Sequence, residues 1–149
     1  WYPAAADGAE QEKADRRLAQ IRRALEELGR EGIALELDDP GTREGGTFPI
    51  RSEMYDALAR NDIILVDLSG VRPNVCVEAG YALQHHERHR LLFIFQTNEA
   101  CNGTPAYTSP PFDLSDFRYE AIEDSGQLLE ILPRHLREIW RQAGGTVVA

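Results

Sequence analysis

One acidic residue, Glu78, lies where a helix is predicted to begin after an apolar strand. It belongs to the stretch VDLSGVRPNVCVEAGYA, residues 66–82. The pattern predicts a buried strand that ends at Asp67, a short loop, and a helix that begins at Asn74 as its N-cap. Glu78 follows Asn74 by four residues and so shares its helical face. Such a carboxylate either complements the helix dipole or stabilises a sugar carbon that becomes electron-poor when a glycosidic bond breaks.

Polar residues close to Glu78 in the sequence could contact a ligand. Asp67 could bind ribose hydroxyls, or it could accept hydrogen bonds from loop amides. Ser69 and Asn74 could bind phosphate or ribose, or they could act as caps alone. Tyr81 continues the face of Glu78, and the small Gly80 could let the helix approach the sheet or a ligand closely. The residues alone leave these alternatives open.

Two further candidates come from other segments. Asp38 follows a short apolar segment, where it could contact ribose or belong to a solvated turn. Arg51 begins the next predicted helix, where it could meet a phosphate or form a surface ion pair. Both are therefore candidate substrate-binding residues.

Histidine and cysteine side chains give weaker signals. His85 and His89 are four residues apart on a predicted helix, but a zinc site usually needs a third protein ligand, and none is obvious. We therefore expect a solvated helix end and no metal site. Cys76 lies between two valines, and we expect it to be a small buried apolar residue.

The segments that must position these residues alternate between helix and strand. Hydrophobic periodicity predicts helices at about 7–30, 49–60, 74–88 and 125–142. It predicts strands at 33–37, 62–67 and 91–95 and an edge strand at 117–121. The first helix carries an apolar stripe formed by Ala14, Leu18, Ile21, Leu25 and Leu28. Pro133 should kink or split the last helix.

This alternation predicts a single α/β domain over residues 1–149 with a parallel sheet. Such a sheet normally starts with a strand, so Trp1 and Tyr2 would be the end of a first strand that is short or missing. Ligands bind at the carboxyl ends of parallel strands. The loops expected there are 38–47, 68–73 and 96–111.

Composition excludes several classes of protein. The chain has 149 residues and a net charge of −9, which argues against a nucleic-acid polymer as ligand. A small phosphorylated ligand remains compatible with this charge. Two cysteines make no disulfide framework, no apolar run could span a membrane, and no signal peptide is visible, so we expect a cytoplasmic protein. Walker and G-x-G-x-x-G motifs are absent, which argues against a phosphate-transfer enzyme and against a standard dinucleotide-binding protein.

The segment DIILVDLSGVRPNVCVEAGYAL, residues 62–83, resembles the signature shared by bacterial TIR-like domains and nucleoside 2-deoxyribosyltransferase-like domains. The resemblance extends over residues 51–95, and PFDLSDFRYEAI, residues 111–122, also resembles these families. It implies a flavodoxin-like parallel sheet of four to five strands flanked by helices. It assigns the catalytic carboxylate, which acts on the N-glycosidic bond of a nucleoside or NAD, to Glu78. A family contact to the base would fall on Trp1 or Tyr2.

Three functions follow from the resemblance. The first is an enzyme that cleaves the N-glycosidic bond of NAD or a related nucleotide in bacterial defence or signalling, and the RPNV turn favours it. The second is a nucleoside or nucleotide deoxyribosyltransferase or N-glycosidase. The third is a non-catalytic nucleotide-binding module. In the first two, NAD or the nucleotide is a substrate, and no cofactor is expected. We also expect a homo-oligomer, with other proteins of a signalling system as further partners and no membrane partner.

Overall fold

The structure is a computed structural model that describes residues 8–38, 50–99, 106–111, 114 and 117–143, with the backbone alone at 9–10 and 50–53. The elements, in chain order, are α1 (Gly8–Arg30), α2 (Ile50–Arg60), β1 (Ile64–Asp67), α3 (Pro73–His85), η2 (Arg88–Arg90), β2 (Leu91–Gln96), β3 (Tyr119–Ile122), η3 (Ser125–Gln127) and α5 (Leu128–Gln142). The first strand expected at Trp1 and Tyr2 lies outside these residues.

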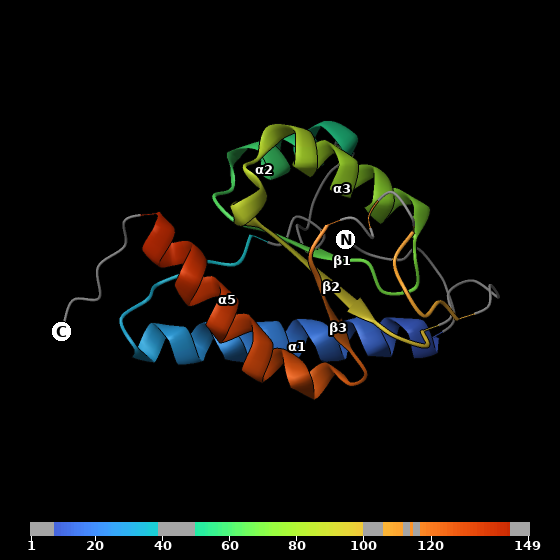
Figure 1. The fold of residues 1–149 in the computed structure, drawn as a ribbon, viewed down its shortest axis with the longest axis horizontal. Coiled ribbons are helices and arrows are strands. Elements are labelled where there is room, and N and C mark those ends of the chain that lie inside the picture. The colour runs from blue at the N-terminus through green and yellow to red at the C-terminus, as the bar shows by residue number, and fades with distance from the viewer. Residues whose placement is uncertain (1–7, 39–49, 100–105, 112–113, 115–116, 144–149) are drawn as a thin grey trace.

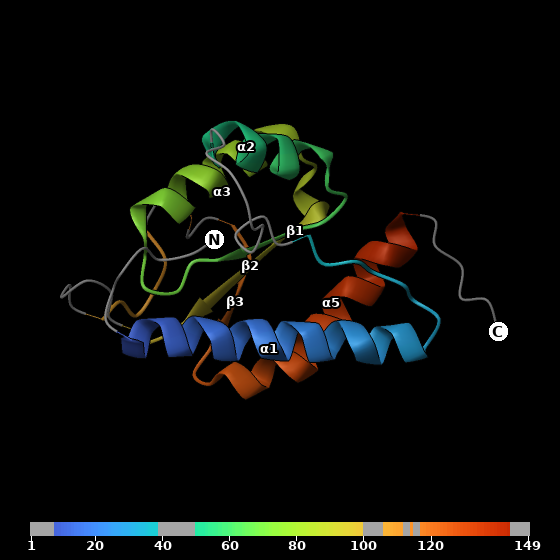
Figure 2. The same cartoon turned by 180° about the vertical axis from the view of Figure 1, so that it is seen from behind.

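The described strands form a parallel sheet in the order β1-β2-β3. Ile64 pairs with Leu91 in the first ladder, and Phe93 pairs with Tyr119 in the second. Helices α2 and α3 cover one face of this sheet, and α1 and α5 cover the other (Figures 1 and 2). The predicted α/β class with a parallel sheet is confirmed, with three strands in the described part of the chain.

Strand β2 shows why the sheet is buried on both faces. Its residues Leu91–Phe95 are all buried. Phe93 and Phe95 pack with Val75 and Ala79 of α3, whereas Leu92 and Ile94 pack in the cluster formed by α1 and α5. Because successive side chains of a strand point to opposite faces, a continuous apolar run is what a sheet between two helical layers requires.

Helix α1 buries a slightly different stripe from the predicted one. Arg17, Ala24 and Leu28 are fully buried, whereas Leu18 and Leu25 of the predicted stripe are only half-buried. The helix packs along α5, and Glu31, just after α1, accepts two hydrogen bonds from Arg137 at 2.7 and 2.6 Å. The inward face of α1 therefore includes a cation.

The prediction of a strand at 33–37 is wrong. These residues lie in no strand of the structure, although Ile33 is buried and Leu35 packs against the α1–α5 cluster. A strand needs a neighbouring backbone for its hydrogen bonds. In the described residues, β1 pairs only with β2, so the apolar pattern at 33–37 reflects side-chain burial and no ladder.

The remaining helices and strands follow the predictions closely. Strand β3 lies at an edge of the described sheet, as expected, two residues later than its predicted start. Helix α5 runs without interruption through Pro133, so the expected split does not occur. No helix in the described part of the chain combines the length and apolar character that a membrane span requires.

Candidate functional site

A buried ionic cluster occupies the carboxyl ends of β1 and β2. Arg17 reaches this edge from α1 with only 1% of its surface exposed. Its Nε donates to Asp67 Oδ2 at 2.6 Å, and its Nη1 donates to Gln96 Oε1 at 3.0 Å. Nη1 and Nη2 also donate to the two carboxylate oxygens of Glu99 at 2.6 and 3.1 Å. One guanidinium thus joins the ends of two strands to the loop after β2.

Electrostatics keep this guanidinium charged. Burial is the largest single influence, and it lowers the pKa of Arg17, but Asp67 and Glu99 together outweigh it and raise the net pKa above the ordinary value. The Glu99 side chain is also buried, with 1% of its surface exposed, whereas that of Asp67 is 33% exposed. Two acids therefore share one buried arginine, which forms an ion pair with each of them.

Ser69 connects the loop after β1 to the next strand. The Ser69 backbone N–H donates to Asp67 Oδ1 at 3.0 Å, and the Gln96 backbone N–H donates to Ser69 Oγ at 2.9 Å. Gly70 and Val71 follow with positive φ angles of 72° and 46°, which turn the chain toward α3. Asp67 and Ser69 therefore lie together, and each already has hydrogen-bond partners within the protein.

Glu78 differs from these residues in having no such partner. It is half-buried on α3, next to Ala79, which is fully buried against the sheet. Burial raises the pKa of the Glu78 carboxyl. Among the described residues, none forms a hydrogen bond or an ion pair with this carboxylate. A carboxyl group that is partly desolvated and unpaired is suited to proton transfer or to stabilising a developing positive charge.

The start of α3 corrects the prediction for Asn74. Arg72 occupies the N-cap position, no side chain caps the helix there, and Pro73 is its first residue. Proline is favoured at this position because its missing N–H would have no partner in the first turn. Asn74 is consequently the second helical residue and is exposed, so it does not cap α3.

Tyr81 lies on α3 between two other rings. Its centroid is 4.4 Å from that of Tyr55 on α2 and 3.9 Å from that of His85. The Nδ1 atom of His85 also lies 3.0 Å from the Tyr81 carbonyl oxygen. These contacts place Tyr81 in the α2–α3 interface.

In the described part of the chain, no group of three His, Cys, Asp or Glu side chains could hold a metal ion.

Gly80 is not the residue at which α3 approaches the sheet; the alternative of a close approach to a ligand stays a prediction. No atom of the described residues lies within 4 Å of the position that a Cβ would occupy there, and the residue is exposed. Ala79, its neighbour, makes the close approach to the sheet instead.

Asp38 lies at the opposite end of β1 from Asp67. Its Oδ2 accepts hydrogen bonds from Arg60 Nη2 at 2.8 Å and from Asn61 Nδ2 at 3.2 Å, both just before β1. The sequence placed Asp38 at a carboxyl strand end, and that placement is wrong because no strand forms at 33–37. The side chain of Arg51, together with Trp1 and Tyr2, lies outside the described residues.

The predictions from the sequence did not include three members of the ionic cluster: Arg17, Gln96 and Glu99. Only Arg17 carried a usable signal. It is separated from Ile21, Ala24 and Leu28 by four, seven and eleven residues, which places a cation in line with apolar positions. A cation on a buried stripe requires an acidic partner, since an unpaired buried charge is too costly. Gln96 and Glu99 carried no comparable pattern.

Comparisons of this chain with protein-family models, with curated proteins and with solved structures find no match. The family resemblance of residues 62–83 therefore stays a prediction. The candidate site comprises two parts: the ionic cluster that joins the strand ends, and Glu78 on the helix that follows β1, which has no partner among the described residues.

Proposed function

We propose that this protein cleaves the N-glycosidic bond of NAD or a related nucleotide, with Glu78 as the catalytic carboxylate. One observation carries the proposal: Glu78 is half-buried, has a raised pKa, and has no partner among the described residues. Such a group is costly to a fold, and catalytic sites are where such groups are retained. The resemblance of the surrounding segment to TIR-like and deoxyribosyltransferase-like domains supplies the reaction.

In this mechanism, the sugar carbon becomes electron-poor as the bond to the base breaks. The Glu78 carboxylate would stabilise that carbon, or attack it, and water or another acceptor would complete the reaction. The nucleotide is the substrate, and no cofactor takes part. We also propose a flavodoxin-like sheet of four to five strands and a homo-oligomeric active form.

The ionic cluster would then be a support beneath the site. Asp67 and Ser69 were candidates for ribose or phosphate binding, but Arg17, the loop amide and β2 already use their polar atoms. Their part in this proposal is to fix the loop that leads into α3. Asn74, exposed in the first turn of α3, remains a candidate ligand contact.

The same engagement of Asp67 favours a second candidate, a nucleotide-binding module without catalysis. Because Asp67 is bound to Arg17, it is not free to bind ribose, and the site lacks one of the substrate contacts expected of an enzyme. In that case Glu78 would contribute to affinity and not to a reaction.

The test is Glu78→Gln, which keeps the shape of the side chain and removes its charge. We expect the release of free base from NAD, NADP or a nucleoside to fall at least about a hundredfold while nucleotide binding persists. Base release would be followed by chromatography, and binding by calorimetry. The matched control is Glu87→Gln, an exposed acid just after α3, which should keep wild-type activity.

Each outcome separates the candidates. Cleavage by Glu78→Gln at the wild-type rate would remove Glu78 from the mechanism. Binding without cleavage by the wild type, even when concentrated enough to assemble, would favour the binding module. Base exchange in the presence of a second nucleobase would identify a transferase. The absence of both binding and cleavage would overturn the proposal.

A further inference from the structure

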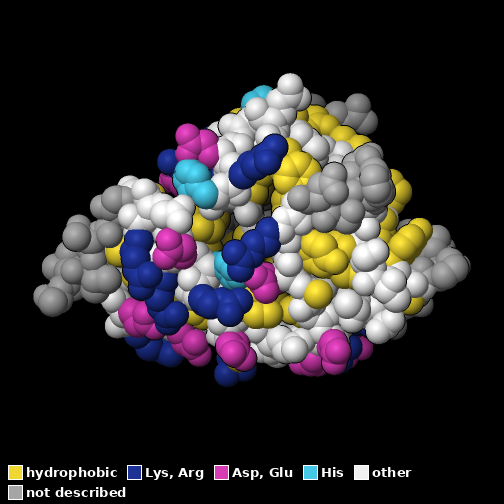
Figure 3. Space-filling model, in the orientation of Figure 1, with side chains coloured by type: hydrophobic (Ala, Val, Ile, Leu, Met, Phe, Trp, Pro, Cys, Tyr) yellow, Lys and Arg dark blue, Asp and Glu magenta, His cyan; other side chains and the backbone are white. Residues whose placement is uncertain are grey.

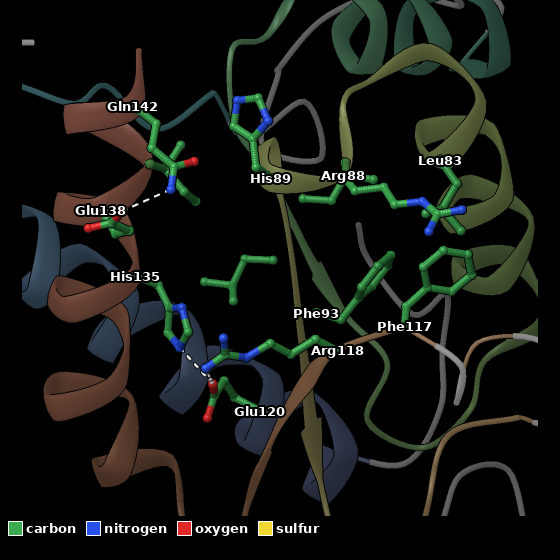
Figure 4. A pocket seen from close by; sticks show the side chains of 13 residues that line it. Leu83, Arg88, His89, Phe93, Phe117, Arg118, Glu120, His135, Glu138 and Gln142 are labelled. Carbon is green, nitrogen blue, oxygen red and sulfur yellow. Dashed lines mark hydrogen bonds and ion pairs between the residues drawn. The ribbon is translucent and has the colours of Figure 1, made fainter. Parts of the chain in front are cut away.

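A cavity of about 300 Å³ lies at the amino ends of β2 and β3. Residues of α5 form one wall, and η2 with the end of α3 forms the other (Figure 4). The carboxyl ends of the strands, where Asp67 and Gln96 lie, are at the opposite end of the sheet. This cavity is therefore distinct from the proposed catalytic site.

The lining of the cavity combines an apolar part with charged and polar side chains. It includes Leu83 of α3, Phe93 of β2, Phe117 before β3 and Ile139 of α5. The Phe93 and Phe117 rings are 6.2 Å apart. A volume of this size is at the lower end of the range found for small-molecule sites, which combine apolar walls with a few polar groups. The walls would accommodate a short aliphatic or single-ring body.

Cations gather around the mouth of this cavity. Figure 3 shows Arg and His side chains around a hollow on the face that α5 and β3 share, in a protein whose net charge is −9. Arg88 lies over the Phe117 ring, with its Cζ atom 5.4 Å from the ring centroid (Figure 4). Among the described residues, no carboxylate pairs with Arg88. A guanidinium held against an aromatic ring and without an acid is available to an anion.

Glu120, the acid deepest in this group, is already neutralised. His135 Nε2 lies 2.6 Å from Glu120 Oε1, and Arg118 and Arg134 approach the same carboxylate at 3.5 and 3.6 Å. Arg118 is largely exposed at the mouth, where a second anion could share it.

Two other acids near the mouth, in the part of the chain that the structure describes, are also paired. Glu138 contacts Arg141 at 3.3 Å, and Glu87 contacts His89 at 3.4 Å. Together with the residues around Glu120, this group contains four arginines, three glutamates and two histidines. They are Arg88, Arg118, Arg134 and Arg141; Glu87, Glu120 and Glu138; and His89 and His135. Among the described side chains in and next to the lining, arginines therefore outnumber glutamates by one, whereas the whole chain has a net charge of −9.

We propose that this cavity binds a small organic anion that has an apolar body, with Arg88 and Arg118 holding its phosphate or carboxylate group. The apolar walls account for the body, and the surplus of arginines accounts for the charge. The acidic character of the rest of the protein restricts the ligand to a molecule small enough to fit within this patch. The inference does not depend on the proposed reaction at Glu78.

The test uses four probes: phenyl phosphate, benzoate, inorganic phosphate and benzyl alcohol. Binding would be followed by two-dimensional amide NMR, which also reports where each probe binds. We expect phenyl phosphate or benzoate to shift amides of β3 and α5, inorganic phosphate to bind more weakly, and benzyl alcohol to bind more weakly still. Preference for phenyl phosphate would identify a phosphate ligand, and preference for benzoate a carboxylate ligand.

The double variant Arg88→Ala/Arg118→Ala should weaken binding at least about tenfold, since a hydrogen bond to a charged group contributes about 1.5 kcal/mol or more. The matched control is Arg22→Ala/Arg23→Ala, which removes two exposed arginines from α1. Three results would overturn the proposal: no binding of either aromatic anion, equal binding of benzyl alcohol, or an equal loss in the control. Amide shifts confined to other parts of the protein would overturn it too.

Discussion

Arg17 holds together parts of the protein that are far apart in the sequence. It is separated from Asp67 by 50 residues and from Glu99 by 82. Asp67 lies at the end of β1 and Glu99 in the loop after β2, and both carboxylates contact this one guanidinium, so its removal would leave two acids near each other without their cation. The side chain therefore compensates a repulsion that the fold itself creates.

Replacing Arg17 with Met should lower the free energy of unfolding by about 3 kcal/mol or more, because the buried Glu99 would lose its partner. Urea denaturation at neutral pH measures this loss. Arg16→Met is the control, since Arg16 is exposed and, among the described residues, forms an ion pair only with Glu12 on the same helix. It should change stability by less than about 0.5 kcal/mol.

The double variant Arg17→Met/Glu99→Met keeps this prediction testable if the single variant does not fold. It removes both buried charges, so it should recover part of the lost stability. Equal losses in Arg17→Met and Arg16→Met would contradict the supporting role of the cluster.

Glu78 should make stability depend on pH in a defined direction. Its folded-state pKa is raised, so the group imposes no cost at acidic pH, where it is protonated in both states, and it destabilises the fold as the pH rises through the folded-state pKa. Glu78→Gln should therefore be more stable than wild type at neutral pH, by a few tenths of a kcal/mol. The difference should disappear below the ordinary pKa range of glutamate.

Denaturation curves recorded from below the ordinary pKa range of glutamate up to neutral pH check this sign. Glu87→Gln, an exposed carboxylate, should show no comparable gain. A gain for Glu78→Gln that is the same at every pH would mean that burial of the charge is not its cause.

At the scale of elements, α3 serves two parts of the molecule. Its first turns follow the carboxyl end of β1 and carry Glu78, whereas Leu83 near its end borders the cavity at the amino ends of β2 and β3. Its buried face, formed by Val75, Ala79 and Ala82, anchors it to the sheet. The exposed position of Gly80 shows that the fold itself does not need a glycine there.

Gly80→Ala should raise the free energy of unfolding by roughly 0.5 to 1 kcal/mol, because alanine loses less conformational freedom in a helix and the structure has room for its Cβ. Thermal or urea denaturation measures it. The reverse exchange on the buried face, Ala79→Gly, should destabilise by about 1 kcal/mol or more. Reduced nucleotide binding by a more stable Gly80→Ala would indicate that the ligand, and not the fold, needs the small residue.

At the scale of the whole molecule, the two candidate sites occupy opposite ends of one sheet. Glu78 and Leu83 are five residues apart on α3, which places them about 140° apart around the helix axis. Glu78 shares its face with Tyr81, which packs against α2, whereas Leu83 lies toward α5 and β3. The two sites therefore face different parts of the molecule, and we expect neither to take part in binding the other's ligand.

Glu78→Gln should accordingly leave the affinity for phenyl phosphate unchanged within about twofold, as expected for distant and independent sites. Titration by amide NMR with wild type and variant makes the comparison. A loss comparable to that of Arg88→Ala/Arg118→Ala would mean that the probe binds at the Glu78 site.

The sequence alone determined the helices, the three described strands and the position of Glu78 early in a helix. These depend on the local alternation of apolar and polar residues, which each segment carries by itself. The same local information produced the errors. Residues 33–37 have a strand-like pattern but no ladder partner in the described sheet, and Asn74 has a capping side chain but follows a proline that already begins the helix.

Tertiary structure decided which polar residues lie together. Asp67 could not be assigned to the fold or to a ligand until Arg17 was placed beside it, and Asp38 could not be placed without knowing whether a strand precedes it. Burial and ion pairing depend on side chains that come from distant segments. For the same reason, Arg88, Arg118 and His135 carried no signal of a shared cavity until the strands and helices were packed together.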